Sequence, residues 1–146
     1  EDLLSQSDVV SLHCPLTTES HKMINAERLA MMQPHALLIN TARGAIIDID
    51  ALLDALRNGT IAGAGIDVLP AEPPAPEDAI ALAYANGKDP IVGERLFLTP
   101  HAAWSSPESV ADARRLSVET AMQYLRDGSL RNLVNAPAQK RFSGAA

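Results

Sequence analysis

Short apolar runs alternate with amphipathic segments along the chain. Four runs have the length and the aliphatic composition of buried strands: Val9–Leu12, Ala36–Ile39, Ala62–Val68 and Leu96–Leu98. Between them, apolar residues recur at helical spacing, as at Leu52, Leu53 and Leu56. Such alternation predicts parallel strands joined by right-handed crossovers. We therefore expect an α/β fold with about four strands.

Capping residues place the ends of the first crossover helices. Asn25 can cap a helix of about residues 26–32. Asp48 or Asp50 can cap the next helix, and Asn58-Gly59 suits its end because glycine adopts the left-handed conformation easily. Each helix is therefore expected to end before the next apolar run begins.

The second half of the chain contains a proline-rich loop and a long helix. The loop is too poor in backbone donors for a regular element, and its prolines are Pro70, Pro73, Pro74 and Pro76. A short helix of about residues 77–84 should follow it. Ser106-Pro107 is typical of a helix start and predicts a closing helix of about 107–127, followed by a loose tail of about 131–146.

Composition is consistent with this α/β reading and excludes several classes of protein. The chain has 146 residues, 47% of them hydrophobic with few aromatics, which suits one aliphatic domain with helices on both faces of a parallel sheet. The net charge of −6 and the scattered basic residues argue against a nucleic-acid partner. No apolar run approaches the ~20 residues that span a bilayer, so we expect no membrane partner and a cytoplasmic location. Cys14 is the single cysteine, which excludes an intrachain disulfide.

Ionisable residues follow three of the strand-like runs. Arg43 lies in Asn40-Thr41-Ala42-Arg43-Gly44, Glu72 lies shortly after Gly65-Ile66-Asp67-Val68, and His101 ends Thr99-Pro100-His101. The carboxyl ends of parallel strands are where α/β sheets bind ligands. These three residues are therefore the first candidates for a functional site.

These three motifs, in this order along the chain, resemble those of the D-isomer-specific 2-hydroxyacid dehydrogenases. The resemblance is to their nicotinamide-binding domain, and it extends to Ser7–Thr17 and to the closing helix near 111–125. Within the family, His101-Ala102-Ala103-Trp104 is most similar to the C-terminal-binding-protein branch. The resemblance implies a Rossmann-type doubly wound sheet, of which this chain would be the C-terminal portion, and a hydride transfer between NAD and a D-2-hydroxy acid or 2-keto acid.

The resemblance also implies a role for each of the three ionisable residues. Arg43 would bind the substrate carboxylate, since a guanidinium grips a carboxylate with two parallel hydrogen bonds. His101 would be the acid/base group, and Glu72 would favour its protonated form. Without the resemblance, an ion-pair arginine, a structural histidine and an exposed carboxylate would be the simpler readings.

Cofactor contacts are expected from segments that match cofactor-facing parts of the family. The matched residues are Cys14, Pro15, Leu16, Thr17, Thr41, Ala42, Arg43, Asp67, His101, Ala103 and Trp104. Asp67 corresponds to the acid that meets the nicotinamide carboxamide, although a turn cap at a strand end is its alternative reading. Trp104 could equally be core packing. We expect NAD, with NADP left open, and no metal, because His13, His21 and His35 lie in different elements.

The chain departs from the family in lacking the G-x-G-x-x-G fingerprint, the ribose-binding acid and the N-terminal substrate domain. We therefore expect a piece of a longer dehydrogenase whose partner is a small 2-keto or 2-hydroxy acid. The full-length protein is expected to be a homodimer, and the isolated chain to self-associate. A nicotinamide-responsive protein similar to the corepressors, or a chain that is inactive in isolation, are the alternatives.

Overall fold

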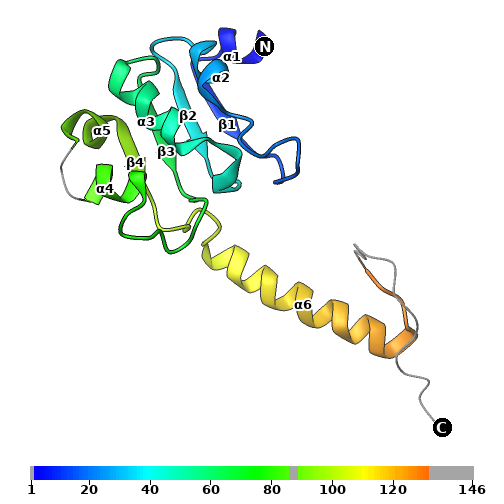
Figure 1. The fold of residues 1–146 in the computed structure, drawn as a ribbon. Coiled ribbons are helices and arrows are strands. Elements are labelled where there is room, and N and C mark those ends of the chain that lie inside the picture. The colour runs from blue at the N-terminus through cyan, green and yellow to red at the C-terminus, as the bar shows by residue number, and fades with distance from the viewer. Residues whose placement is uncertain (1, 86–88, 132–146) are drawn as a thin grey trace. The chain divides into compact units, whose positions relative to one another are not determined.

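The computed structural model describes residues 2–85 and 89–131. The chain divides into two compact units after Ala103, and each is described by itself. The first unit holds a parallel sheet with its helices, and the second holds one long helix (Figure 1).

The sheet of the first unit has four parallel strands in the order β1-β2-β3-β4, which confirms the predicted parallel α/β fold. The strands are β1 (Val9–Leu12), β2 (Leu37–Asn40), β3 (Gly63–Ile66) and β4 (Leu96–Leu98). The register aligns Leu12, Asn40, Ile66 and Leu98 across the sheet. The four strands thus end together, and the loops that follow them emerge along one edge.

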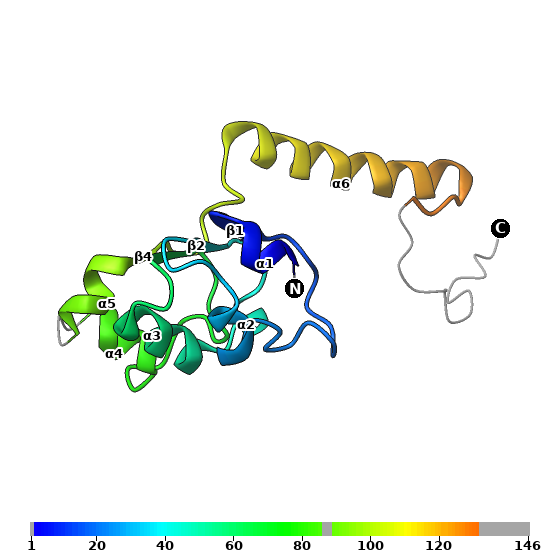
Figure 2. The same ribbon diagram turned by 90° about the horizontal axis from the view of Figure 1, so that it is seen from above.

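The crossover helices of this unit cover one face of the sheet. They are α2 (Ala26–Ala30), α3 (Ile49–Asn58), α4 (Ala79–Ala85) and α5 (Pro90–Arg95), and Figure 2 shows them on the same side. A right-handed crossover puts its helix on a side that depends on the direction in which the sheet grows. Because each strand is added beyond the previous one, every crossover helix falls on the same face. The sheet residues of that face, such as Leu38, are buried.

The opposite face of the sheet is apolar and exposed within this unit. Val9, Leu37 and Phe97 are 55%, 42% and 67% exposed. In a doubly wound sheet, helices of the other half cover this face, because that half grows in the opposite direction. The predicted helices on both faces therefore belong to a complete sheet, of which this unit supplies one side.

Most helix ends agree with the capping residues read from the sequence. The Asn25 side chain accepts a hydrogen bond from Arg28 N, and Gly59 ends α3 in the left-handed conformation with φ of 68°. Asp48 occupies the N-cap position of α3 without making the capping bond, because its carboxylate is paired with Lys22 at 3.1 Å.

The first unit also contains α1 (Asp2–Gln6). Two further short helices, the 3-10 helix η1 (Gly44–Ile46) and α5, were not predicted from the sequence. The signal for α5 was present, since Asp89 caps Val92 N and Pro90 occupies the first turn.

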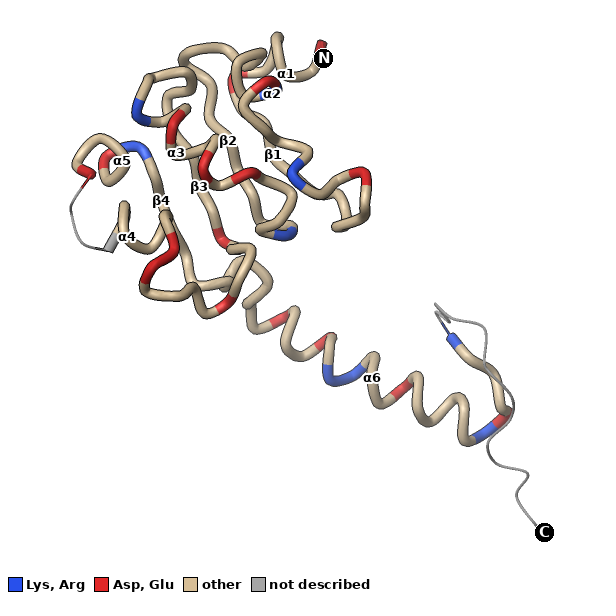
Figure 3. Tube along the Cα trace, viewed as in Figure 1, with Lys and Arg blue, Asp and Glu red and all other residues tan. Residues whose placement is uncertain are grey.

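The second unit contains α6 (Pro107–Asp127), with the bounds expected for the closing helix. A capping box joins Ser106 and Ser109, and Gly128 ends the helix with φ of 72°. None of its side chains is buried within the described chain, and acidic and basic residues are interspersed along it (Figure 3). The expected tail of about 131–146 lies outside the described residues except for Arg131.

Candidate active site

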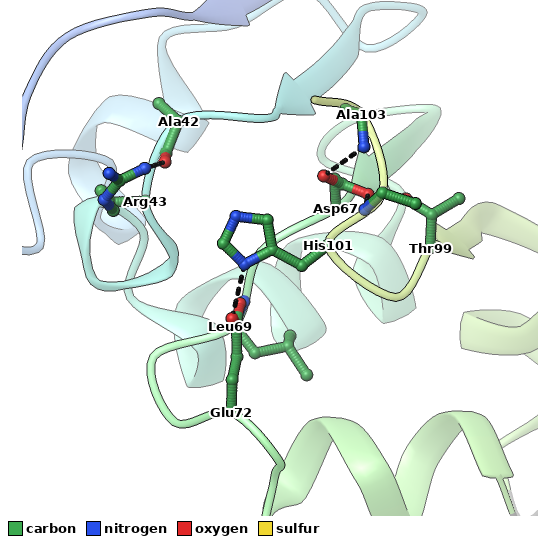
Figure 4. A network of polar contacts seen from close by, with 9 residues as sticks. Ala42, Arg43, Asp67, Leu69, Glu72, Thr99, His101 and Ala103 are labelled. Atoms are coloured by element: carbon green, nitrogen blue, oxygen red, sulfur yellow. Dashed lines mark hydrogen bonds and ion pairs between the residues drawn. The ribbon is translucent and has the colours of Figure 1, made fainter. Parts of the chain in front are cut away.

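The three candidate side chains come from loops that leave the same edge of the sheet. Arg43 follows β2, Glu72 follows β3 and His101 follows β4. Figure 4 shows the His101 ring pointing toward Glu72, with Arg43 on the loop across from it. The common ending of the strands is what brings residues 29 and 58 positions apart in the chain into one region.

The loop that carries Arg43 is shaped by Asn40, the last residue of β2. Asn40 is fully buried; its Oδ1 accepts a hydrogen bond from Ala42 N and its Nδ2 donates to Arg43 O, both at 3.0 Å. The Arg43 side chain is exposed and donates from Nη1 to Ala42 O at 2.6 Å. The buried Asn40 side chain therefore fixes the backbone of the loop, while the Arg43 guanidinium lies at the surface.

Gly44 lets this loop approach the loop that follows β3. A Cβ atom on Gly44 would lie 2.0 Å from the carbonyl carbon of Leu69 and 2.4 Å from Pro70 N. Both neighbouring atoms are backbone, so no side-chain rotation would relieve the clash. Glycine is required here for close approach of two backbones, which keeps the Arg43 loop against the loop that leads to Glu72.

His101 and Glu72 are joined by a hydrogen bond. The distance from His101 Nδ1 to Glu72 Oε2 is 2.6 Å, and Glu72 Oε1 accepts a hydrogen bond from Leu69 N at 2.8 Å. The bond from His101, followed by the bond from Leu69, holds the pKa of Glu72 below its usual value. Glu72 is thus ionised near neutrality and occupies Nδ1, so Nε2 is the ring nitrogen left for a substrate.

The turn that presents His101 is held by Asp67, the residue after β3. Asp67 is 5% exposed. Its Oδ1 accepts from Thr99 Oγ1 and from Ala102 N, and its Oδ2 accepts from Ala103 N at 3.0 Å. Burial alone would raise the pKa of this carboxyl, but the bonds from Thr99, Ala103 and Ala102 outweigh burial and lower the pKa.

A pocket brings the three candidate residues together. It has a volume of about 300 Å³ and is lined by Arg43, Gly44, Val68, Leu69, Pro70, Glu72 and His101. A fixed cation and an ionisable imidazole on one small pocket can bind an anion and transfer a proton to it. No group of three potential metal ligands occurs among residues 2–85 and 89–131.

A second hollow, of about 570 Å³, joins two of the segments expected to contact the cofactor. His13, Cys14, Pro15 and Leu16 line one side, and Thr41, Ala42 and Arg43 line the other. Arg43 lines both hollows. The hollow thus joins two segments that lie far apart in the sequence, whereas the glycine-rich cradle for a pyrophosphate is not part of this sequence.

Four of the expected cofactor residues in the first unit do not line this hollow: Thr17, Asp67, His101 and Ala103. Thr17 lies in a turn in which its N–H donates to Ser20 Oγ at 2.7 Å, and it does not line the hollow. Trp104 begins the second unit. Their cofactor roles stay predictions.

Asn40 and Gly44 belong to the motif quoted around Arg43 but were given no role from the sequence, although both shape the site. A polar residue at the end of an apolar run was the available signal for Asn40. The requirement at Gly44 depends on Leu69, which is 25 positions away and lies in another loop.

Comparison with known proteins supports one family for most of the chain. Residues 1–103 match the family described as D-isomer specific 2-hydroxyacid dehydrogenase, NAD binding domain. A glycerate dehydrogenase of Methylorubrum extorquens is 48% identical over 110 residues, which are 75% of this chain and 32% of that protein. A glyoxylate reductase of Korarchaeum cryptofilum is 40% identical over 96% of this chain and 39% of its own length.

A solved structure agrees with these sequence relatives. The D-isomer specific 2-hydroxyacid dehydrogenase of Lactobacillus delbrueckii ssp. bulgaricus, in its NAD complexed form, superimposes with a TM-score of 0.76 at 31% identity. The match covers 92% of this chain and 42% of that chain. The chain therefore spans about a third to two fifths of the length of the relatives that it matches. Within its described residues, no helix has both the length and the apolar character needed to cross a bilayer.

Proposed function

The chain belongs to the D-isomer-specific 2-hydroxyacid dehydrogenases, within their NAD-binding domain, and from this premise we propose that the protein containing it interconverts a 2-keto acid and a D-2-hydroxy acid. The single observation that carries the proposal is the pocket shared by Arg43, Glu72 and His101. One cation, one proton donor and one carboxylate that stabilises the donor are what this reaction requires of the protein.

In the proposed reaction, Arg43 holds the substrate carboxylate and thereby orients the neighbouring carbonyl toward His101. When bound, a reduced nicotinamide cofactor would supply the hydride for the carbonyl carbon. His101 Nε2 gives its proton to the carbonyl oxygen, so that a 2-hydroxy acid forms and the imidazole becomes neutral. Glu72, bonded to Nδ1, stabilises the imidazolium from which the reduction starts and fixes the orientation of the ring.

Steady-state kinetics of the full-length protein test this proposal. We expect NADH-dependent reduction of at least one of glyoxylate, hydroxypyruvate and pyruvate, with a loss of kcat/KM of about 10²-fold or more in a His101→Ala variant, as is usual for removal of an acid/base group. A full-length protein that reduces none of these acids with NADH or NADPH contradicts the proposal.

The alternative of a nicotinamide-responsive interaction protein gains nothing from the relatives, which are named as enzymes. The narrower assignment to the C-terminal-binding-protein branch likewise has no specific support. Turnover at the rate of a metabolic enzyme would separate the two functions.

The setting of the enzyme is part of the proposal. We propose a cytoplasmic homodimer acting on a small 2-keto or 2-hydroxy acid without a nucleic-acid partner. We also propose that residues 1–146 are the C-terminal portion of its dinucleotide-binding domain, closed by α6. The parallel sheet that lacks cover on one face supports this assignment of the domain.

A further inference from the structure

Two buried polar side chains lie directly beneath the candidate site. Among the described residues, the buried polar or charged ones are Ser20, Asn40 and Asp67. Ser20 closes the turn that begins at Pro15. Asn40 and Asp67 lie at the ends of neighbouring strands, and Asp67 N donates to Asn40 O at 2.9 Å. Burial of polar groups is unfavourable unless they are hydrogen-bonded, so the partners of these two residues show what they stabilise.

All the partners of the Asp67 carboxylate belong to the segment that presents His101. Thr99 Oγ1 and Ala102 N donate to Oδ1, and Ala103 N donates to Oδ2. In addition, His101 N donates to Asp67 O at 2.9 Å. Asp67 therefore makes hydrogen bonds before, at and after His101.

His101 needs such support because its backbone is left-handed, with φ of 51°. This conformation is unfavourable for residues with a Cβ atom. It persists only where surrounding contacts outweigh the strain. The four hydrogen bonds to Asp67 are those contacts, and they aim the imidazole at Glu72.

Asn40 has the equivalent relation to Arg43. Its amide oxygen and its amide nitrogen both bond to the backbone of the Arg43 loop, at Ala42 N and Arg43 O. Asn40 does not line the pocket and is fully buried, so its contribution is made through Arg43.

We propose that Asn40 and Asp67 are positioning residues, a hydrogen-bonded pair that fixes the Arg43 loop and the His101 turn relative to each other. This inference rests on the proposed function for its catalytic meaning. The proposed role of Asp67 requires no cofactor. It therefore differs from the contact with the nicotinamide carboxamide that the family resemblance implies.

Asp67→Asn is the main test, made in the full-length protein and followed by nuclear magnetic resonance. The amide keeps the shape but has one acceptor oxygen, so Ala102 N or Ala103 N must face an NH₂ group. We expect hydrogen exchange at one of these two amides to rise about tenfold or more, the effect of losing one hydrogen bond. We also expect the His101 ring to lose its proton at lower pH, because it no longer reaches Glu72.

A double variant separates this role from a general loss of structure. The charged groups around His101 are Glu72 at its Nδ1, Arg43 across the pocket and Asp67 beneath the turn. Asp67→Asn also removes a negative charge that acts on His101 directly. If Asp67 in addition acts through the His101–Glu72 bond, the change in His101 titration that Asp67→Asn causes will be smaller in a Glu72→Gln background than in the parent, whereas a purely direct charge effect will be equal in both. Asp89→Asn is the matched control, because Asp89 also holds a backbone amide, that of Val92, but far from the site.

Asn40→Asp tests the other half of the pair in the full-length protein. It keeps the acceptor for Ala42 N and removes the donor to Arg43 O. We expect KM for the keto acid to rise about tenfold, corresponding to one lost hydrogen bond, while the pH of the basic limb stays in place. Asp67→Asn should show the opposite behaviour: the basic limb of its pH profile should move to lower pH, while KM for the keto acid should change little.

Unchanged amide exchange and unchanged His101 titration in Asp67→Asn would overturn the proposal. If that variant does not fold, Thr99→Val is the substitute, because it removes one donor to Asp67 at nearly constant volume. It should change amide exchange and His101 titration in the same direction but by less. If neither changes in Thr99→Val, the proposal is likewise overturned. The resonance measurements need no turnover, so a protein that reduces no keto acid contradicts the proposed function and leaves this test intact.

Discussion

At the scale of single residues, the site divides into groups that would touch the substrate and groups that hold them. Arg43, Glu72 and His101 line the pocket, whereas Asn40 and Asp67 are buried below it. The first group was predicted from the sequence because the residue types carry recognisable chemistry. The second group was not predicted in its present role, because hydrogen bonding between loops depends on which strands lie side by side.

Replacement of Arg43 should show that geometry matters as well as charge. In the full-length protein, Arg43→Ala should lower kcat/KM for a keto acid, and Arg43→Lys should remain impaired by about 10–100-fold, because an ammonium cannot form the paired bonds of a guanidinium. Steady-state kinetics measure both. Arg57→Lys is a control, since Arg57 forms a surface pair with Asp54 and Asp89. A lysine variant with parental kcat/KM would remove Arg43 from its role.

Glu72→Gln should move the basic limb of the pH profile. The variant removes the negative charge beside Nδ1 at nearly constant shape, so the imidazolium is less favoured and His101 loses its proton at lower pH. Reduction should therefore fail at lower pH than in the parent. The profile of kcat/KM against pH measures this, and a basic limb that stays in place contradicts the Glu72–His101 pairing.

The lowered pKa values of Asp67 and Glu72 also predict acid sensitivity. Each carboxyl binds its proton less readily in the folded state than in the unfolded state. Their stabilisation is therefore present above the unfolded pKa values and is lost as pH falls through the folded ones. Thermal unfolding followed from pH 7 to pH 3 should show a loss of stability that is smaller in Asp67→Asn. An equal loss in parent and variant would contradict the assignment to Asp67.

At the scale of elements, the β2 and β3 loops must touch for the pocket to exist. Gly44 begins η1 and packs on the backbone of Leu69 and Pro70. This contact joins the loop of the substrate-binding cation to the loop of Glu72. Any side chain at position 44 should therefore separate two parts of the site at once.

Gly44→Ala should destabilise the chain by about 2–3 kcal/mol, the upper part of the usual range for overpacking. Gly93→Ala is the matched control in α5, where an added Cβ would meet nothing within 4 Å. That variant should stabilise the chain by about 0.5–1 kcal/mol, because alanine is the better helix former. Denaturant unfolding of both variants measures the difference. A Gly44→Ala variant as stable as the parent would mean that the two loops are not in close contact.

The elements that the sequence predicted well are those with a local signal. The four strands followed from apolar runs, and α6 followed from Ser106-Pro107 at its start and Gly128 at its end. The helix α5 was missed because its six residues contain Gly93 and only one full turn of apolar pattern. The 3-10 helix η1 depends on the contact at Gly44, which no local pattern reports.

At the scale of the whole molecule, the uncovered face of the sheet is the dominant feature. Val9, Leu37 and Phe97 are exposed there, and β1 is an edge strand with unpaired backbone groups. Exposed apolar surface of this kind favours association. In a complete doubly wound sheet, the other half covers this face and also carries the pyrophosphate cradle, at a helix N-terminus.

We therefore expect the isolated 146-residue chain to self-associate and to bind NAD negligibly. Light scattering and titration with NAD measure the two properties. Phe97→Lys places a charge on the uncovered face and should reduce association, whereas Leu82→Lys, on α4 and 38% exposed, is a control away from that face. A monomer that binds NAD at micromolar concentration would contradict both expectations.

The sequential order of the strands has a consequence for how this unit is assembled on the ribosome. Each of β2, β3 and β4 pairs with the strand synthesised just before it, and the paired residues are 28, 26 and 32 positions apart, so every step closes a loop of modest length. The sheet can grow by one strand at a time while the chain emerges. The turn that carries His101 follows β4, and the Asp67 carboxylate that binds this turn follows β3 and is therefore synthesised earlier. The His101–Glu72 hydrogen bond can therefore form only after the last strand of this unit has been synthesised.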